Sequence, residues 1–375
     1  MKKTIITLLL PLFSVLIINA QIADGYYHIK NTLTDRYLSI NDTKPENYQV
    51  SQSASVNLAG IRTYINYDTV AVSPSCVVFI SSLPGGGYNV SGQGSSLYAM
   101  TNYKLPIDIT PSGDSYIISG TYSGFTLSLK DRSPSDEDGF IVTTDTGMEY
   151  WTFLPINTTS EYIGIHPDIK TADGTYWGTI KAGFSFRLVS EGMAAFYVSN
   201  AGGTGFTMNQ IEGDVVPAGT PVIIRCNSEN VQDNKIEPVI GAYDLGDITN
   251  CLGGVYCSLS VSKHFNRTPY DPLTMRILGL SDNGELAFVK NIPAERLHNE
   301  LYLMANKAYL QLNTKVENAD VMTHGGYTPD PEAINDIKTD DNSTSIYTLM
   351  GVRLPNGVTP KAGIYVKNGR KIIIK

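Results

Sequence analysis

Short runs in which apolar and polar residues alternate fill the chain after its first twenty residues. From 24 to 157 these runs are separated by residues typical of turns. Alternation with a period of two is typical of a β-strand that buries one face. The runs form three blocks, which begin at Gly25, Gly86 and Asp114. The pattern predicts an all-β region without long helices.

Two of these blocks share an internal spacing. Ile29 and Leu38 are nine residues apart, and so are Ile118 and Leu127. This spacing indicates a weak internal repeat. The blocks begin at uneven intervals of 61 and 28 residues. An irregular barrel or sandwich is therefore an alternative to a regular three-fold repeat.

Two short motifs in this region match a known family. The form Gly-x-Tyr-x-Ile-x-Asn followed by Tyr-Leu, at 25–38, resembles the opening of a ricin-type β-trefoil lobe. Glu149-Tyr150-Trp151 resembles a degraded form of that family's Gln-x-Trp signature. The resemblance implies a β-trefoil-like domain over 21–157, with Trp151 in its core. The family's sugar-binding Asp and Asn-x-Gln set is not present, so the resemblance carries fold more than ligand.

The strand pattern changes but continues from 158 to 326. Two stretches, 195–224 and 286–312, each hold strand-like runs, then Ala-Gly or Ala-Asn, then an apolar strand. The glycine permits a tight turn before that strand. Similar strands recur in exported surface proteins of anaerobic Gram-negative bacteria, and this resemblance implies a β-sandwich-like domain over 158–326. The one helical piece predicted is short, around 294–300.

The last part of the chain reads as a linker followed by a small β domain. Segment 327–344 is rich in acids and has no apolar period, so it is predicted to be a linker. Segment 345–375 has six Lys or Arg and no acid. Asn368-Gly369 between its last two runs is typical of a type I′ hairpin.

The C-terminal segment is similar to the sorting domain of type IX secretion substrates, from Ile346 to Lys375. The resemblance implies that the export machinery is a partner, or that the segment ties the protein to the cell surface. An ordinary β-tail is the alternative.

The first twenty residues have the order of a secretory signal peptide. Lys2 and Lys3 precede an apolar run at 4–18, and a small residue, Ala20, follows. Cleavage between Ala20 and Gln21 is predicted. An uncleaved membrane anchor is the alternative, although the run is short for a bilayer span of about 20 residues. The expected location is the periplasm, the outer surface or the medium.

Charge and cysteine content narrow the classes of partner. The net charge is −8, and removing Lys2 and Lys3 makes it −10. An acidic chain argues against a nucleic-acid ligand, which needs a basic face. No stretch of the mature chain is apolar enough to span a membrane. Disulfides and buried free thiols are equally open for the cysteines, and spacing chooses no pairing. The cysteines are Cys76, Cys226, Cys251 and Cys257.

No motif for catalysis, a cofactor or a metal stands out. The five histidines are scattered and no Cys-x-x-Cys occurs, so no zinc site is predicted. The closest sequence to a serine hydrolase elbow, at 120–124, places its serine wrongly and fits a hairpin turn. Acids at 136–139 fit a solvated loop better than a calcium loop.

Aromatic side chains are the candidate ligand-binding residues, because flat rings complement the faces of sugars. Tyr176 and Trp177 follow a predicted turn at Asp173-Gly174, which would expose them. A core position for Trp177 is the alternative.

Together these patterns predict an exported, non-catalytic protein that binds a glycan or a protein. The alternatives are a structural or adhesin-type envelope component and a secreted polysaccharide hydrolase.

Overall fold

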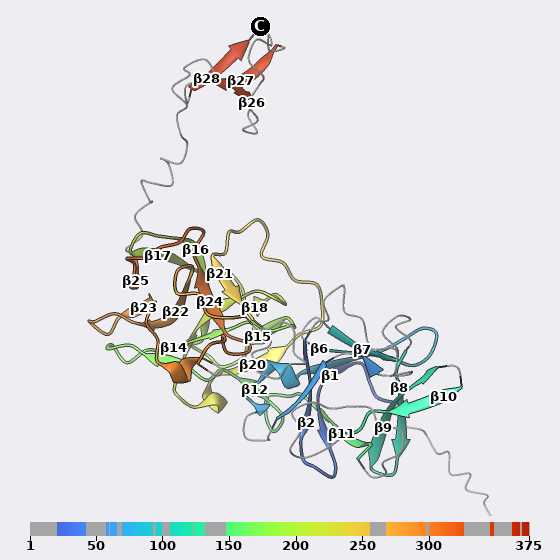
Figure 1. Ribbon diagram of the computed structural model, residues 1–375. Coiled ribbons are helices and arrows are strands. Elements are labelled where there is room, and N and C mark those ends of the chain that lie inside the picture. The colour runs from blue at the N-terminus through green and yellow to red at the C-terminus, as the bar shows by residue number, and fades with distance from the viewer. Residues whose placement is uncertain are drawn as a thin grey trace, which may run out of the picture. The chain divides into compact units, whose positions relative to one another are not determined.

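A computed structural model shows two compact units, residues 1–327 and 328–375 (Figure 1). The structure describes residues 21–42, 58–59, 61–65, 70–92, 95–99, 106–122, 124–131, 148–255, 268–297, 300–325, 346–348, 362–367 and 370–374. The predicted signal peptide, linker and acidic loop at 136–139 lie outside these residues.

The described chain is all β, as the alternating pattern predicted. The helical elements whose bounds the structure describes are three 3₁₀ turns: η1 (Pro74–Cys76), η2 (Val231–Asp233) and η3 (Ala294–Arg296). In the described part of the helical piece predicted around 294–300, the helix is a single turn, η3. None of the described helical segments has the length and apolar character needed to cross a membrane.

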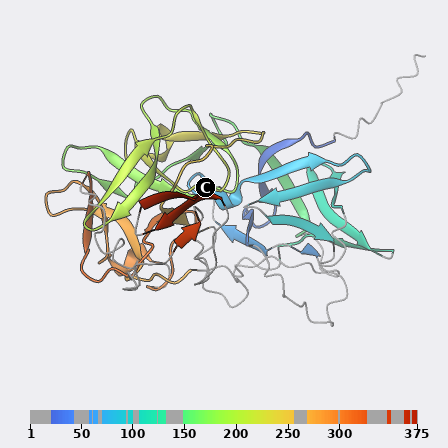
Figure 2. The same cartoon turned by 90° about the horizontal axis from the view of Figure 1, so that it is seen from above.

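Six strands of the N-terminal region form a closed ring, drawn from blue to green in the two views (Figure 1, Figure 2). Each strand is paired with the next, and the last returns to the first. One junction, between β6 and β8, is the bridge from Tyr88 to Ile107. In ring order the strands are β1 (Gly25–Asn31), β5 (Val78–Ser82), β6 (Tyr88–Gly92), β8 (Asp108–Ser112), β9 (Ser115–Tyr122) and β11 (Tyr150–Pro155).

Further strands pair outside the ring. They are β2 (Tyr37–Asp42) with β4 (Ile61–Ile65), β7 (Ser95–Ala99) with β3 (Leu58–Ala59), and β10 (Phe125–Ser128) with β9. The blocks predicted at Gly25, Gly86 and Asp114 begin at β1, just before β6 and just before β9. The nine-residue spacing places Ile29 on β1 and Leu38 on β2, and the equivalent pair lies on β9 and β10.

Trp151 lies in the core of this region, as the sequence predicted. Its side chain is completely buried, and its indole N–H donates to the carbonyl oxygen of Leu129 at 3.0 Å. A buried indole N–H needs such a partner, because an unpaired one loses its bonds to water. Trp151 therefore ties β11 to the chain that follows β10.

A curled ten-stranded sheet forms much of the middle region. Its order is β13 (Ile169–Lys170), β14 (Tyr176–Ile180), β19 (Val222–Cys226), β16 (Ala194–Gly202), β17 (Gly205–Gln210), β25 (Val321–His324), β23 (Leu286–Val289), β22 (Met275–Leu280), β24 (Ala308–Gln311) and β21 (Leu252–Gly254). A smaller sheet has the order β12 (Ile163–Gly164), β20 (Lys235–Pro238), β15 (Phe186–Leu188) and β18 (Val215–Val216).

The large sheet contains two similar halves around β25. In one half, β16 and β17 form a hairpin and β19 pairs with β16. In the other half, β22 and β23 form a hairpin and β24 pairs with β22. The residues before the third strands, Gly219 and Asn306, both have positive φ, 78° and 57°. The predicted Ala-Gly and Ala-Asn turns are therefore equivalent. The sequence comparison began the second stretch at 286, on β23, whereas the structural equivalent of β16 is the preceding strand, β22. The two strands of a hairpin have the same kind of apolar pattern, so the pattern did not distinguish them.

Two apolar clusters lie on opposite faces of the strands β14, β19 and β16. The first, between these strands and the smaller sheet, includes Ile165, Phe186 and Ile224. The second, inside the curl of the large sheet, includes Phe206, Phe288 and Leu310. Consecutive strand residues point to opposite faces, so one strand contributes to both clusters.

The N-terminal region shares the first of these clusters. Val77 is buried in it, and Tyr26 packs against Phe79 and Phe184 with ring centroids 4.8 and 5.9 Å away. The buried His28 also pairs its Nδ1 with Glu161 Oε2 at 3.0 Å. Residues on both sides of the predicted boundary at 157/158 thus belong to one compact unit, and that boundary stays a prediction.

The C-terminal unit contains a three-stranded antiparallel sheet. Its strands are β26 (Ile346–Thr348), β27 (Gly363–Lys367) and β28 (Arg370–Ile374). Lys367 pairs with Arg370, which confirms a hairpin with a two-residue loop. The loop residues, 368–369, lie outside the described part. The cross-strand partners Ile364 and Ile373 are both exposed.

The three described cysteines are free thiols. Cys76 and Cys226 are buried, and Cys251 is half-buried. Burial raises the pKa of all three, that of Cys226 to about 12. Because the thiolate is the reactive form, a raised pKa lowers the reactivity of these groups at neutral pH. Cys257 lies outside the described residues.

Candidate functional site

The two ends of the curled sheet meet along a seam between β14 and β24. Lys181 N donates to Asn306 O, and Asn306 Nδ2 donates back to Lys181 O, both at 2.9 Å. Ala308 N donates to Thr179 Oγ1 at 3.3 Å. One backbone bond and two bonds that involve side chains join the two ends here, and the seam brings together residues that are far apart in the sequence.

An ion pair between Asp168 and Lys307 crosses this seam. Lys307 Nζ lies 2.7 Å from Asp168 Oδ1. The other carboxylate oxygen, Oδ2, accepts bonds from the backbone N and the hydroxyl of Thr179, at 2.8 and 3.2 Å. Both oxygens of Asp168 are thus engaged, and its side chain is only 11% exposed, against 35% for Lys307. The carboxylate is therefore held in one position, and Lys307 is the more exposed partner of the ion pair.

A hollow of about 200 Å³, called here the first hollow, lies on one side of the ion pair. Its apolar wall is formed by Leu303, Met304 and Tyr309, and Glu295 and Arg296 of η3 contribute charged groups. Arg296 Nη1 donates to Leu278 O at 3.0 Å, which positions the guanidinium at the wall.

A second hollow, of about 260 Å³, lies on the other side of the same ion pair. His166 and Asn306 provide hydrogen-bonding groups, and Val72 and Pro74 provide an apolar wall. The last two residues come from the N-terminal region, just before and within η1. The two hollows have Asp168, Thr179 and Lys307 in common.

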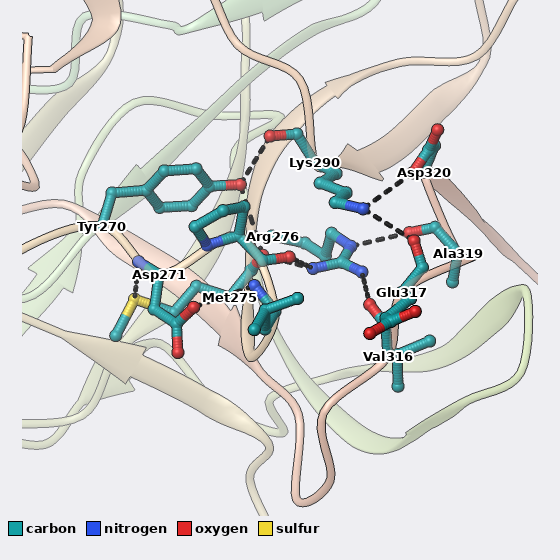
Figure 3. Close-up of polar contacts among 11 residues, drawn as sticks. Tyr270, Asp271, Met275, Arg276, Lys290, Val316, Glu317, Ala319 and Asp320 are labelled. Carbon is teal, nitrogen blue, oxygen red and sulfur yellow. Dashed lines mark hydrogen bonds and ion pairs between the residues drawn. The ribbon is translucent and has the colours of Figure 1, made fainter.

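A buried arginine, whose polar contacts Figure 3 shows, precedes a residue that lines the first hollow. Arg276 has no exposed surface, and it donates to four backbone carbonyl oxygens at 2.6 to 2.9 Å. The acceptors are those of Pro272, Met275, Val316 and Ala319. The next residue on β22, Ile277, points to the opposite face and lines the first hollow. The arginine thereby fixes the strand that carries this wall.

Two more side chains brace the same turn (Figure 3). Tyr270 donates its hydroxyl to Lys290 O at 2.7 Å, and burial raises the pKa of that hydroxyl to about 12. Lys290 Nζ donates to Glu317 O at 2.6 Å and lies 3.3 Å from Asp320 Oδ1. These contacts join β22, β23 and the segment before β25.

The structure places the predicted ligand residues on opposite faces of β14. Tyr176 packs against the first apolar cluster, and Lys170 Nζ lies 4.8 Å from the centre of its ring. Trp177 packs inside the large sheet, 5.6 Å from Phe196. The two rings therefore do not form one binding surface, and neither of them lines the first or the second hollow.

The residues around the ion pair were not predicted from the sequence. Asp168 and Lys307 are separated by most of the middle region, and their meeting depends on the curl of the sheet. One local signal was available: Asn306 precedes an apolar strand in the way that Gly219 does. An asparagine with positive φ marks a turn that presents the following residue, here Lys307, at the start of a strand.

The sequence matches no protein-family model, and no curated protein is significantly similar to it. Among the described residues no three His, Cys, Asp or Glu side chains form a metal-binding group. The hollows combine apolar walls with a few fixed polar groups, which is the composition of a small-ligand binding site.

Proposed function

We propose that the protein is an exported, non-catalytic glycan-binding protein, with its ligand bound at the Asp168–Lys307 ion pair. The observation that carries the proposal is the pair of hollows that meet there. A sugar ring offers hydroxyl groups along its edge and C–H groups on its faces. Polar groups such as Arg296 and Asn306 match the hydroxyls, and apolar walls such as Met304 and Val72 match the faces.

We also propose a β-trefoil-like fold for 21–157 and a β-sandwich-like fold for 158–326. The closed six-stranded ring, with further strands pairing beside β1, β6 and β9, supports the first. The apolar cluster between the four-stranded sheet and one face of the large sheet supports the second.

Export and surface location remain part of the proposal. The basic and apolar order of residues 1–20 supports removal of a signal peptide between Ala20 and Gln21. The three-stranded sheet in the C-terminal unit is compatible with a sorting domain over 345–375, whose partner would be the export machinery.

Binding of residues 21–375 to a broad glycan array tests the proposal. A specific hit is expected, and Lys307→Gln should weaken it at least tenfold by removing the ammonium group shared by both hollows. Lys30→Gln is the matched control, because Lys30 forms an ion pair of the same length, 2.7 Å, with Asp35 in the N-terminal ring. This control should bind like the unaltered protein.

A blank array would overturn the proposal of a glycan ligand. Capture of a specific protein from an envelope extract, lost in Lys307→Gln, would then establish a protein ligand at the same site. A blank result in both experiments would favour a structural or adhesin-type role in the envelope.

A further inference from the structure

We infer that the site holds two consecutive sugar residues of a glycan, one in each hollow, and that Lys307 binds between them. The inference rests on the proposed function and adds the size of the recognised unit and the direction in which it lies. It also makes the N-terminal region part of the binding site.

The volumes of the two hollows limit the size of the ligand unit that each can hold. Each volume, about 200 and 260 Å³, is below the roughly 300–1,000 Å³ of pockets that enclose whole drug-sized ligands. Each hollow is therefore too small to enclose a whole drug-sized ligand, and a single sugar ring is the unit we assign to each. Because the two share Asp168, Thr179 and Lys307, a ligand that fills both must pass over the ion pair.

The first hollow offers both kinds of hydrogen-bonding group beside an apolar wall. Arg296 uses one N–H for Leu278 O, and the structure records no other partner for it among the described residues. Glu295, the preceding residue of η3, is exposed and can accept. A donor and an acceptor side by side match two neighbouring hydroxyls of a sugar, while Met304 and Tyr309 match its apolar face.

Lys307 lies where the two sugars would be joined. An ammonium group has three N–H donors, and Asp168 Oδ1 accepts one of them. The side chain is one-third exposed, so its other donors are within reach of a ligand. The oxygens on either side of a glycosidic bond are acceptors, which suits a donor at this position.

The second hollow is formed by both halves of the compact unit. His166 is exposed and Asn306 is buried, and both belong to the middle region. Val72, 37% exposed, and the buried Pro74 face them from the N-terminal region. The middle region alone would therefore lack Val72 and Pro74, and would keep Ile165, Ile180 and Ala305 as the apolar lining of the second hollow.

Titration calorimetry on residues 21–375 with matched sugars tests the inference. The pairs are glucose and cellobiose, galactose and lactose, and N-acetylglucosamine and N,N′-diacetylchitobiose, together with the corresponding fragments of any array hit. The disaccharide of the recognised pair should bind at least tenfold more tightly than its monosaccharide, because it fills both hollows.

Two variants separate the hollows, and a third is their control. Val72→Arg places a long side chain at the second hollow, and Met304→Arg does so at the first, where the native side chain is 38% exposed. Val189→Arg changes a residue that is 37% exposed and lines neither hollow. Each of the first two should weaken disaccharide binding at least tenfold, only one of them should weaken monosaccharide binding, and Val189→Arg should change neither.

Two outcomes would overturn this inference while leaving glycan binding intact. One is equal affinity for a monosaccharide and its disaccharide. The other is full disaccharide affinity in Val72→Arg. Absence of binding to every sugar tested, including the array, would instead remove the proposed function and this inference with it.

Discussion

At the scale of single residues, Arg276 is a charged side chain without exposed surface. It has no carboxylate partner within ion-pair distance among the described residues, and four carbonyl oxygens surround its guanidinium (Figure 3). Burial lowers the pKa of this group from its usual value, while Tyr270, Asp320 and Asp271 act in the opposite direction. Arginine suits such a place because its five N–H donors lie in a rigid plane.

Replacing this arginine should destabilise the fold strongly. Arg276→Met removes all four hydrogen bonds and leaves buried carbonyl oxygens without donors, at a cost of roughly 3 kcal/mol in the free energy of unfolding. Urea unfolding followed by tryptophan fluorescence measures the loss.

Arg225→Met is the control for that experiment. Arg225 is exposed, and among the described residues its side chain donates one bond, to Gly192 O at 3.3 Å. Its replacement should change the free energy of unfolding by less than about 0.5 kcal/mol. Equal effects of the two substitutions would show that the buried bonds contribute nothing specific.

Asp271, in the same turn, should contribute to sensitivity to acid. The backbone N–H of Leu273 and the hydroxyl of Thr274 both donate to this carboxylate, which lowers its pKa below the usual 3.8. A folded-state pKa below the unfolded one means that stability is present above pH 3.8 and is lost as pH falls through the lower value. Asp271→Asn should therefore flatten the decline in stability below pH 3.8, as measured by unfolding at a series of pH values. An unchanged decline would contradict the assignment.

At the scale of elements, the seam between β14 and β24 depends on one turn. Asn306 holds positive φ, 57°, and its side chain donates to Lys181 O across the seam. Asparagine tolerates this backbone conformation better than most residues, because its short side chain bonds locally.

Substitutions at this turn should separate backbone conformation from hydrogen bonding. Asn306→Gly keeps access to positive φ and loses the bond, which should cost about 1 kcal/mol. Asn306→Ala loses the bond and also strains the backbone by about 1–2 kcal/mol, for a total near 2–3 kcal/mol. Thermal or urea unfolding measures both. Equal losses would show that the positive φ is not a constraint.

The strands were easier to predict from the sequence than the contacts between strands that are far apart in the chain. The blocks at Gly25, Gly86 and Asp114 are visible because each begins a local alternation. The uneven intervals do not prevent ring closure, since β1, β6 and β9 still take their places in the ring. Asp168 and Lys307 form no local pattern, and a residue pair created by the curl of a sheet leaves no periodic trace.

The candidate aromatic residues show the opposite difficulty. Tyr176 and Trp177 follow a predicted turn, which left exposure of both rings and a core position for Trp177 as alternatives. On a strand, neighbours point to opposite faces, so each ring packs against a different cluster. Two aromatic rings on the same face of a strand would have to be two positions apart in the sequence.

At the scale of the whole molecule, the chain contains two compact units. Deleting residues 345–375 should leave the unfolding temperature of the first unit unchanged to within about 2 °C, because its clusters are formed by residues before 328. Under the proposed sorting role, the shortened protein should accumulate in the periplasm. Differential scanning calorimetry and cell fractionation measure the two properties.

The unfolding temperature and the location of the shortened protein distinguish a sorting role from a structural one. An unchanged unfolding temperature with a changed location would support a sorting function of the tail. An unchanged location would show that residues 345–375 have no sorting role, and a large drop in unfolding temperature would show that they stabilise the first unit.

The pairing of β1 with β11 also constrains when the protein can fold. Tyr27 pairs with Pro155, so the ring stays open until nearly the whole N-terminal region has been synthesised. Contacts between residues so far apart in the sequence form slowly, because the chain between them must first be ordered. A chain whose ring closes late stays unfolded for longer than one that folds through local hairpins alone, and an unfolded chain can still pass through a narrow channel. Strand β1 cannot complete its pairing until β11 has been synthesised.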